Sequence, residues 1–130
     1  MPSATGTFEV KTLPQPPEEA AGGEAIGRLL LDKQFHGDIE AKSVGTMLGV
    51  RTAVQGSAGY VAIEKLTGSV KGRSGSFVLQ HSGMMTRGAL EQSVTIIPDS
   101  GTGELAGISG KMTIRIEAGV HHYQLDYTLA

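Results

Sequence analysis

Apolar and polar side chains alternate along most of this chain with a period of two residues, and short glycine-containing turns separate the alternating segments. Such alternation is typical of β-strands, whose successive side chains point to opposite faces of a sheet. Only residues 18–23 offer a window for a brief helical turn. Strands are expected at residues 5–12, 25–36, 39–50, 56–70, 74–86, 89–97, 111–117 and 121–129, with a further short strand around 104–108.

The connections between these segments indicate how the strands pair. Gly37-Asp38, Lys71–Arg73 and Arg87-Gly88 are expected to form tight turns between consecutive strands. Short connections favour antiparallel neighbours, and closure of the sheet removes its exposed edges. We therefore predict an all-β fold, an antiparallel up-and-down β-barrel of about eight strands made by one domain over residues 1–130, with an open sandwich as the alternative.

Composition and charge exclude several classes of function. The net charge is −2 and the basic residues are scattered, which argues against nucleic acid and an anionic membrane as partners. Without cysteine there is no disulfide, thiolate nucleophile or cysteine-based zinc site, and the adjacent His121 and His122 face opposite sides of a strand, so neither metal nor cofactor is expected. The sequence has neither a signal-peptide pattern nor a membrane-length apolar run, so we expect a cytoplasmic protein.

The segment from Pro98 to Gly110 contains glycines at 101, 103, 107 and 110, a density that indicates bends and close backbone approach. Residues 101–110 resemble the Gly-Thr-Gly signature of allene oxide cyclases and dirigent proteins. The wider chain resembles a bacterial family of unassigned function, DUF3224. The segments that carry this second resemblance are 31–38, 56–64, 75–83 and 122–129.

These resemblances imply a barrel with an apolar lumen that assembles as a dimer or trimer. Allene oxide cyclases and dirigent proteins steer a reactive intermediate through a chiral cavity, with little covalent participation by the protein. The family of unassigned function supplies no catalytic residues to carry over, and the glycine signature is architectural, so the resemblance says nothing about the substrate.

His81 is the first candidate for chemistry, because it shares a face with the apolar Phe77, Leu79 and Met85. An imidazole in an apolar lumen suits general acid–base work. The structural interpretation is a core histidine that is hydrogen-bonded to a backbone group or a tyrosine.

Lys33 is the second candidate, because its strand places it on one face with Leu29, Leu31 and Phe35. A buried ammonium needs a partner, and Glu64 is a matching carboxylate, so the two are expected to form a structural or a catalytic pair. Tyr60, on the same face as Glu64, could offer its hydroxyl to a bound oxygen. Tyr123 and Tyr127 belong to an apolar stripe of the kind that usually packs in a core.

Three hypotheses of function follow. In the first, the barrel is a cofactor-independent isomerase, cyclase or lyase for a small apolar molecule, with His81, Lys33, Glu64 and Tyr60 as its catalytic residues. In the second, the barrel binds such a molecule without turnover, and in the third it is filled and acts through oligomer contacts. Apolar residues such as Leu30 and Ile96 are expected on the outer face, which favours a homodimer or homotrimer.

Overall fold

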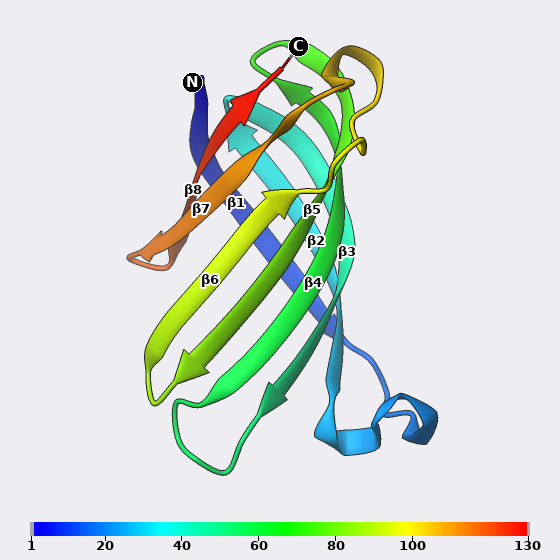
Figure 1. Cartoon of the computed structure of the whole chain (residues 1–130), viewed down its shortest axis with the longest axis vertical. Coiled ribbons are helices and arrows are strands. Elements are labelled where there is room, and N and C mark those ends of the chain that lie inside the picture. Colours follow the sequence, from blue (N-terminus) through cyan, green and yellow to red (C-terminus); the bar gives the residue numbers. More distant parts are fainter. Residues whose placement is uncertain (1, 130) are drawn as a thin grey trace.

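The computed structural model describes residues 2–129 as a closed eight-stranded barrel in which each strand pairs antiparallel with the next and β8 pairs with β1 (Figure 1). The strands are β1 (Ser3–Pro14), β2 (Gly27–Gly37), β3 (Ile39–Arg51), β4 (Ala58–Val70), β5 (Arg73–Thr86), β6 (Ala89–Ile96), β7 (Ser109–Glu117) and β8 (Val120–Thr128). The predicted up-and-down barrel is confirmed, and helical turns make up 7% of the chain.

Three short 3-10 turns complete the structure. Two of them, η1 (Glu19–Ala21) and η2 (Gly23–Ala25), lie between β1 and β2, in and just after the window in which the sequence predicts a helical turn. The third, η3 (Gly103–Leu105), lies between β6 and β7. Within the described residues, no helix is long and apolar enough to cross a membrane.

The prediction of a short strand around residues 104–108 is wrong, because this segment forms the end of η3 and the turn after it. The loop is fastened to β5, where the Thr102 hydroxyl accepts a hydrogen bond from the Ser76 backbone N–H at 3.0 Å and the Thr102 N–H donates to the Ser76 carbonyl at 2.8 Å. Leu105 and Ile108 are both buried. The loop therefore closes one end of the barrel as a plug.

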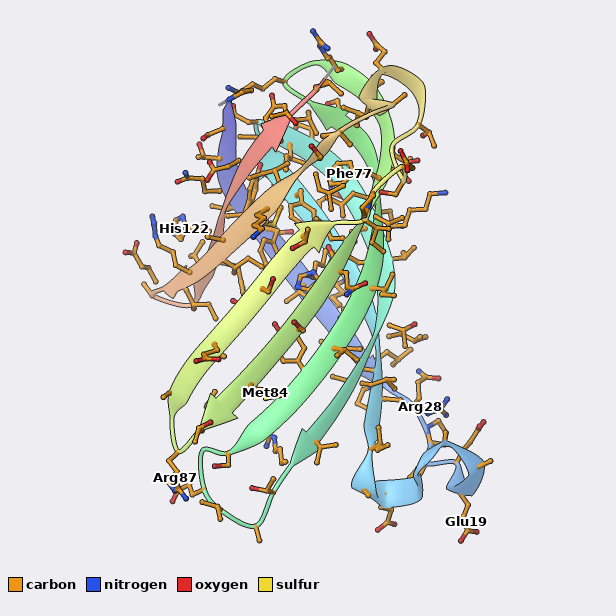
Figure 2. All side chains as sticks on the ribbon, viewed as in Figure 1. Glu19, Arg28, Phe77, Met84, Arg87 and His122 are labelled. Atoms are coloured by element: carbon orange, nitrogen blue, oxygen red, sulfur yellow. The ribbon has the colours of Figure 1, made fainter. Side chains whose placement is uncertain are left out.

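The interior is filled at the plugged end and open at the other. Side chains gather around Phe77 near the plug (Figure 2), and they form one continuous apolar core. The core residues are Ala4, Phe8, Phe35, Ile39, Ala41, Leu66, Val70, Phe77, Leu79, Val94, Ile96, Leu105, Ile108, Met112, Tyr123, Leu125 and Tyr127. The opposite end keeps a hollow of about 490 Å³ between residues such as Leu29, Met47, Met85 and Leu90.

The outer face is apolar in part. Of the two apolar residues expected on it, Leu30 lies there and Ile96 does not. Leu30 faces outward and is 42% exposed, as predicted. Ile96 is buried in the core, so its predicted outward orientation is wrong. The alternation in β6 explains this, because Val94 and Ile96 share a face of the strand and both fill the barrel.

The barrel has a weak seam between β6 and β7. In the described chain these strands pair only at Val94 with Met112 and at Thr95 with Lys111. The other neighbouring strands pair over six to thirteen positions. Beyond the two pairs, β6 and β7 diverge toward the open end (Figure 1).

Candidate functional site

Four polar side chains from four neighbouring strands meet inside the barrel. They are Lys33 on β2, Ser43 on β3, Glu64 on β4 and His81 on β5. The register brings them together, because Lys33 lies opposite Ser43 and His81 lies opposite Ala62, two residues before Glu64 on the same face. The row therefore crosses the β2–β5 wall on its inner surface.

Glu64 is the centre of this cluster. Its Oε2 accepts a hydrogen bond from Lys33 Nζ at 2.6 Å, and its Oε1 accepts one from Ser43 Oγ at 3.1 Å. His81 Nε2 lies 2.9 Å from the same Oε2. The geometry of this contact is not that of an aligned hydrogen bond, so within the described residues this nitrogen is buried without a hydrogen-bond partner.

The cluster is buried, and its charges depend on one another. Glu64 is 1% exposed, His81 4% and Lys33 7%. Burial by itself would raise the pKa of Glu64, but the contacts with His81 and Lys33 outweigh it and hold that pKa below its ordinary value. Glu64 is therefore a carboxylate at neutral pH. The Lys33 ammonium also lies 4.8 Å from the centre of the Phe8 ring, a favourable cation–π position.

Glycine at position 45 lets β3 approach β4 closely beside the cluster. Gly45 lies opposite Glu64 in the register. A Cβ atom at Gly45 would collide with the Ile63 carbonyl oxygen and lie 2.7 Å from the Glu64 Cα. The site thus needs a residue without a side chain at this position.

A cavity of about 430 Å³ lies between the cluster and the open end of the barrel. Lys33 and His81 line it, whereas Glu64 and Ser43 lie behind them. The remaining polar lining comes from Thr12, Tyr60, Gln92 and His121. The rest of the wall is apolar: Phe8, Val10, Leu31, Met47, Ala62, Leu90, Ile114 and Ile116. Residues from both β6 and β7 take part, so the cavity extends to the seam.

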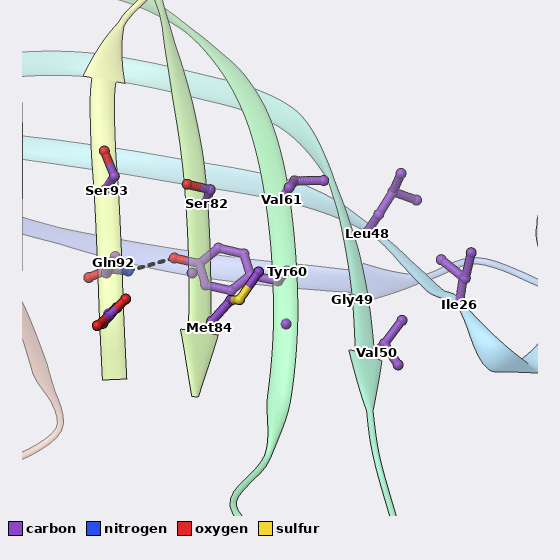
Figure 3. Close-up of a pocket in the computed structure, with 13 residues that line it drawn as sticks. Ile26, Leu48, Gly49, Val50, Tyr60, Val61, Ser82, Met84, Gln92 and Ser93 are labelled. Carbon is purple, nitrogen blue, oxygen red and sulfur yellow. Dashed lines mark hydrogen bonds between the residues drawn. The ribbon is translucent and has the colours of Figure 1, made fainter. Parts of the chain in front are cut away.

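Tyr60 lies farther toward the open end than the other predicted residues. It lines both the cavity and the adjoining mouth of the barrel, and its hydroxyl interacts with Gln92 Nε2 at 2.5 Å (Figure 3). The ring occupies the place that a side chain at Gly83 would take. Tyr60 therefore reaches across β5 to β6 and narrows the passage between the mouth and the cavity.

A larger hollow, of about 720 Å³, lies on the outside of the barrel across β3 to β6. Leu48, Val50, Val61 and Met84 project from its surface (Figure 3). This outer groove is shallow and contains neither Lys33 nor His81. We therefore regard the smaller lumenal cavity as the candidate site, because the buried, charged cluster of Lys33, Glu64 and His81 lies at its inner end.

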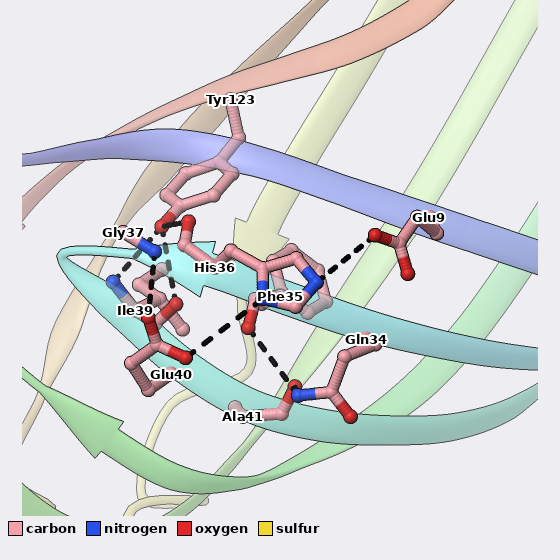
Figure 4. A network of polar contacts seen from close by, with 9 residues as sticks. All are labelled: Glu9, Gln34, Phe35, His36, Gly37, Ile39, Glu40, Ala41 and Tyr123. Atoms are coloured by element: carbon pink, nitrogen blue, oxygen red, sulfur yellow. Dashed lines mark hydrogen bonds and ion pairs between the residues drawn. The ribbon is translucent and has the colours of Figure 1, made fainter.

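Tyr123 has a structural role that is visible from its contacts. Its hydroxyl donates to the His36 carbonyl oxygen at 2.8 Å and accepts from the Ile39 N–H at 2.9 Å, which fastens the turn between β2 and β3 (Figure 4). Burial raises the pKa of Tyr123 to about 12. The prediction that the stripe of Tyr123 and Tyr127 belongs to the core is confirmed.

The structure thus brings Lys33, Glu64 and His81 together and places Tyr60 on the same cavity but outside their cluster. The predicted Lys33–Glu64 pair is confirmed. His81 has a carboxylate as its neighbour, where the structural interpretation expected a backbone group or a tyrosine.

Sequence analysis missed four polar residues of the site, Thr12, Ser43, Gln92 and His121. Ser43 shares a face with Ile39 and Ala41, so the period of two could have placed it inside. Gln92 and His121 line the cavity from β6 and β8. The same period puts Gln92 on one face with Val94 and Ile96, and His121 on one face with Tyr123. It does not show that they reach the cavity, because their approach depends on how the barrel closes.

Comparison with known proteins gives a family but no activity. A family model described as a protein of unknown function, DUF3224, matches residues 4–127. A crystal structure of a DUF3224 protein of unknown function from Shewanella oneidensis MR-1 is 48% identical, with a TM-score of 0.93 over 100% of this chain and 98% of that one. No curated protein matches, and the resemblance to allene oxide cyclases and dirigent proteins finds no support. On this evidence the chain belongs to the DUF3224 family.

Proposed function

We propose that the barrel binds one small, largely apolar molecule in its lumen and acts on it as a cofactor-independent isomerase, cyclase or lyase. The observation that carries this proposal is an apolar cavity with a buried group of titratable side chains at its inner end. Its volume of about 430 Å³ falls in the range of small-molecule sites, roughly 300–1,000 Å³. Apolar walls with a few converging polar groups are the usual composition of such sites.

Each residue of the cluster has a distinct role in this proposal. The Lys33 ammonium donates a hydrogen bond to an oxygen of the ligand and stabilises negative charge that develops there. His81 accepts and returns a proton. Glu64 and Ser43, which lie behind them, hold Lys33 in position, and the shape of the cavity selects the reactive conformer of the ligand.

A second candidate function is binding without turnover. It is favoured by the hydrogen bonds at both Glu64 oxygens, because a carboxylate with partners on each side is also a common structural arrangement. The two candidates share the lumenal site and differ in whether the ligand is changed.

The binding site can be tested with two adjacent residues that face opposite sides of β4. Ala62 is buried and lines the cavity, whereas Val61 is 52% exposed on the outer groove. We expect Ala62→Phe to fill the cavity and weaken binding of the uncharged fluorophore 1-aminoanthracene at least tenfold, while Val61→Phe leaves it unchanged. Native mass spectrometry of the purified protein would show whether a small molecule is retained. Loss of fluorophore binding in Val61→Phe but not in Ala62→Phe would place the site in the outer groove and refute the proposal.

A further inference from the structure

The charges at the inner end of the cavity restrict the chemical class of the ligand. The Glu64 carboxylate and the Lys33 ammonium cancel each other, and Ser43 is neutral. Of the other polar residues on the cavity wall, Thr12 and Gln92 have no ionisable group, and Tyr60 presents a hydroxyl. A ligand carboxylate would add a net negative charge among apolar walls, and this is costly unless His81 or His121 takes up a proton.

An uncharged carbonyl oxygen fits this environment better. An ammonium has three N–H donors, of which the Glu64 oxygen takes one, so Lys33 can donate another to a ligand. The Phe8 ring lies against the same ammonium and keeps it among apolar groups. A hydrogen bond to a carbonyl is strong in such surroundings and does not change the net charge.

We propose, on the basis of the lumenal site above, that the ligand is an uncharged ketone or aldehyde with a C–H bond beside its carbonyl group, and that His81 and Lys33 transfer the proton of that bond. His81 takes the proton at Nδ1, the ring nitrogen turned away from Glu64. The C–H electron pair becomes the C=C bond of an enolate, and the carbonyl π pair moves to the oxygen, where Lys33 donates its hydrogen bond. The imidazolium then returns the proton to the same carbon, or to the far carbon of an adjacent double bond, and the carbonyl reforms.

This step is balanced without any oxidant, reductant or cofactor, because one proton leaves carbon and one returns. With His81 as a neutral base, the site has no net charge before the transfer, and it has none afterwards because the imidazolium compensates the enolate. Glu64 is a positioning residue in this scheme. It lies behind the cavity wall, and both of its oxygens already accept hydrogen bonds.

The experiment uses 2-octanone as the uncharged carbonyl compound and octanoate as the charged compound of matched length. Calorimetry at pH 7.5 is expected to show at least tenfold tighter binding of 2-octanone. Proton NMR in D₂O is expected to show protein-dependent loss of the hydrogens next to the carbonyl. His81→Gln should slow this exchange by roughly a hundredfold or more while 2-octanone still binds. The control is His122→Gln, the same substitution at a histidine of β8 that does not line the cavity. In this variant the hydrogens of 2-octanone should exchange at the wild-type rate.

The outcomes separate this inference from the proposed function. Wild-type protein that binds 2-octanone without exchanging its hydrogens refutes the proton transfer and leaves lumenal binding intact. Tighter binding of octanoate refutes the ligand class. Exchange that persists at the wild-type rate in His81→Gln refutes the role of His81. If neither compound binds and Ala62→Phe does not alter 1-aminoanthracene binding, both the inference and the lumenal site are wrong.

Discussion

At Glu64, burial and charge act in opposite directions on one carboxyl group. Removal from water disfavours the carboxylate, whereas His81 and Lys33 favour it, and the balance holds the pKa below its ordinary value. A buried ion pair of this kind contributes little to stability compared with an apolar pair of the same size. Removal of one partner is nevertheless costly, because the other charge is then left without compensation.

We predict that Glu64→Gln lowers the free energy of unfolding at pH 7 by about 3–5 kcal/mol, because the buried Lys33 ammonium loses its countercharge. This difference from wild type should shrink in acid. Because the pKa of Glu64 is lower in the folded state, its stabilisation is complete above the ordinary value of 4.5 and disappears as the pH falls through the folded-state pKa. Urea unfolding of both proteins from pH 7 to pH 3 measures the effect. A difference that stays constant over this range would contradict the prediction.

The residues of the site were predictable to the extent that strand parity decides them. The period of two places Lys33, Glu64 and His81 on the inner face, and the pairing of opposite charges identifies the first two as partners. Parity cannot show that His81 reaches the Glu64 oxygen or that Tyr60 reaches Gln92. Those contacts depend on the stagger between strands and on side-chain conformations, which a single sequence does not specify.

At the level of elements, the strands could be predicted better than the loop that closes the barrel. The strand segments alternate over most of their length and are bounded by turns, so their ends shift by only a few residues between sequence and structure. In the loop, Leu105 and Ile108 are three residues apart, and in a strand this spacing would put them on opposite faces. Here η3 ends at Leu105, and a turn follows in which the Ile108 N–H donates a hydrogen bond to the Leu105 carbonyl oxygen at 3.1 Å. Both side chains are buried and fill the barrel end.

The close approach of β3 and β4 at Gly45 predicts that a side chain at this position destabilises the protein. Gly45→Ala should lower the free energy of unfolding by about 1–3 kcal/mol, because its methyl group collides with the β4 backbone beside Glu64. Gly59→Ala is the matched control, since a Cβ atom there would have its nearest neighbour at 3.8 Å. That change should be neutral or stabilise by up to about 1 kcal/mol. Denaturant unfolding compares the two variants, and equal stability would show that β3 and β4 do not need this contact.

For the whole molecule, the outer face raises the question of assembly. Several apolar side chains on the outside of β2 to β5 are about 40–70% exposed, which is unusual for a single small domain. They are Leu30, Val44, Leu48, Val50, Val61, Ile63 and Met84. Polar and charged residues occupy much of the outer face of β7, with Lys111, Thr113 and Arg115.

We predict that the protein forms a homodimer or homotrimer through this outer apolar face. Light scattering at micromolar concentration should give two or three times the mass of one chain. Val61→Lys, which places a charge in the middle of the face, should shift the mass toward the monomer, whereas Thr113→Lys on β7, three strands away around the barrel, should not. A monomer mass for the wild-type protein would rule out this assembly.

The short seam between β6 and β7 is the place where the barrel wall has the fewest strand-pairing contacts among the described residues. In the part of the chain that the structure describes, two residue pairs join these strands, so local opening there breaks fewer hydrogen bonds than opening between any other neighbouring strands. Val94 and Met112 belong to the apolar core, so their pair holds the seam closed at that level, while in the described chain β6 and β7 have no pairs toward the open end. Under the proposed function, this unpaired part of the seam offers the ligand a lateral route into the cavity besides the passage beside Tyr60.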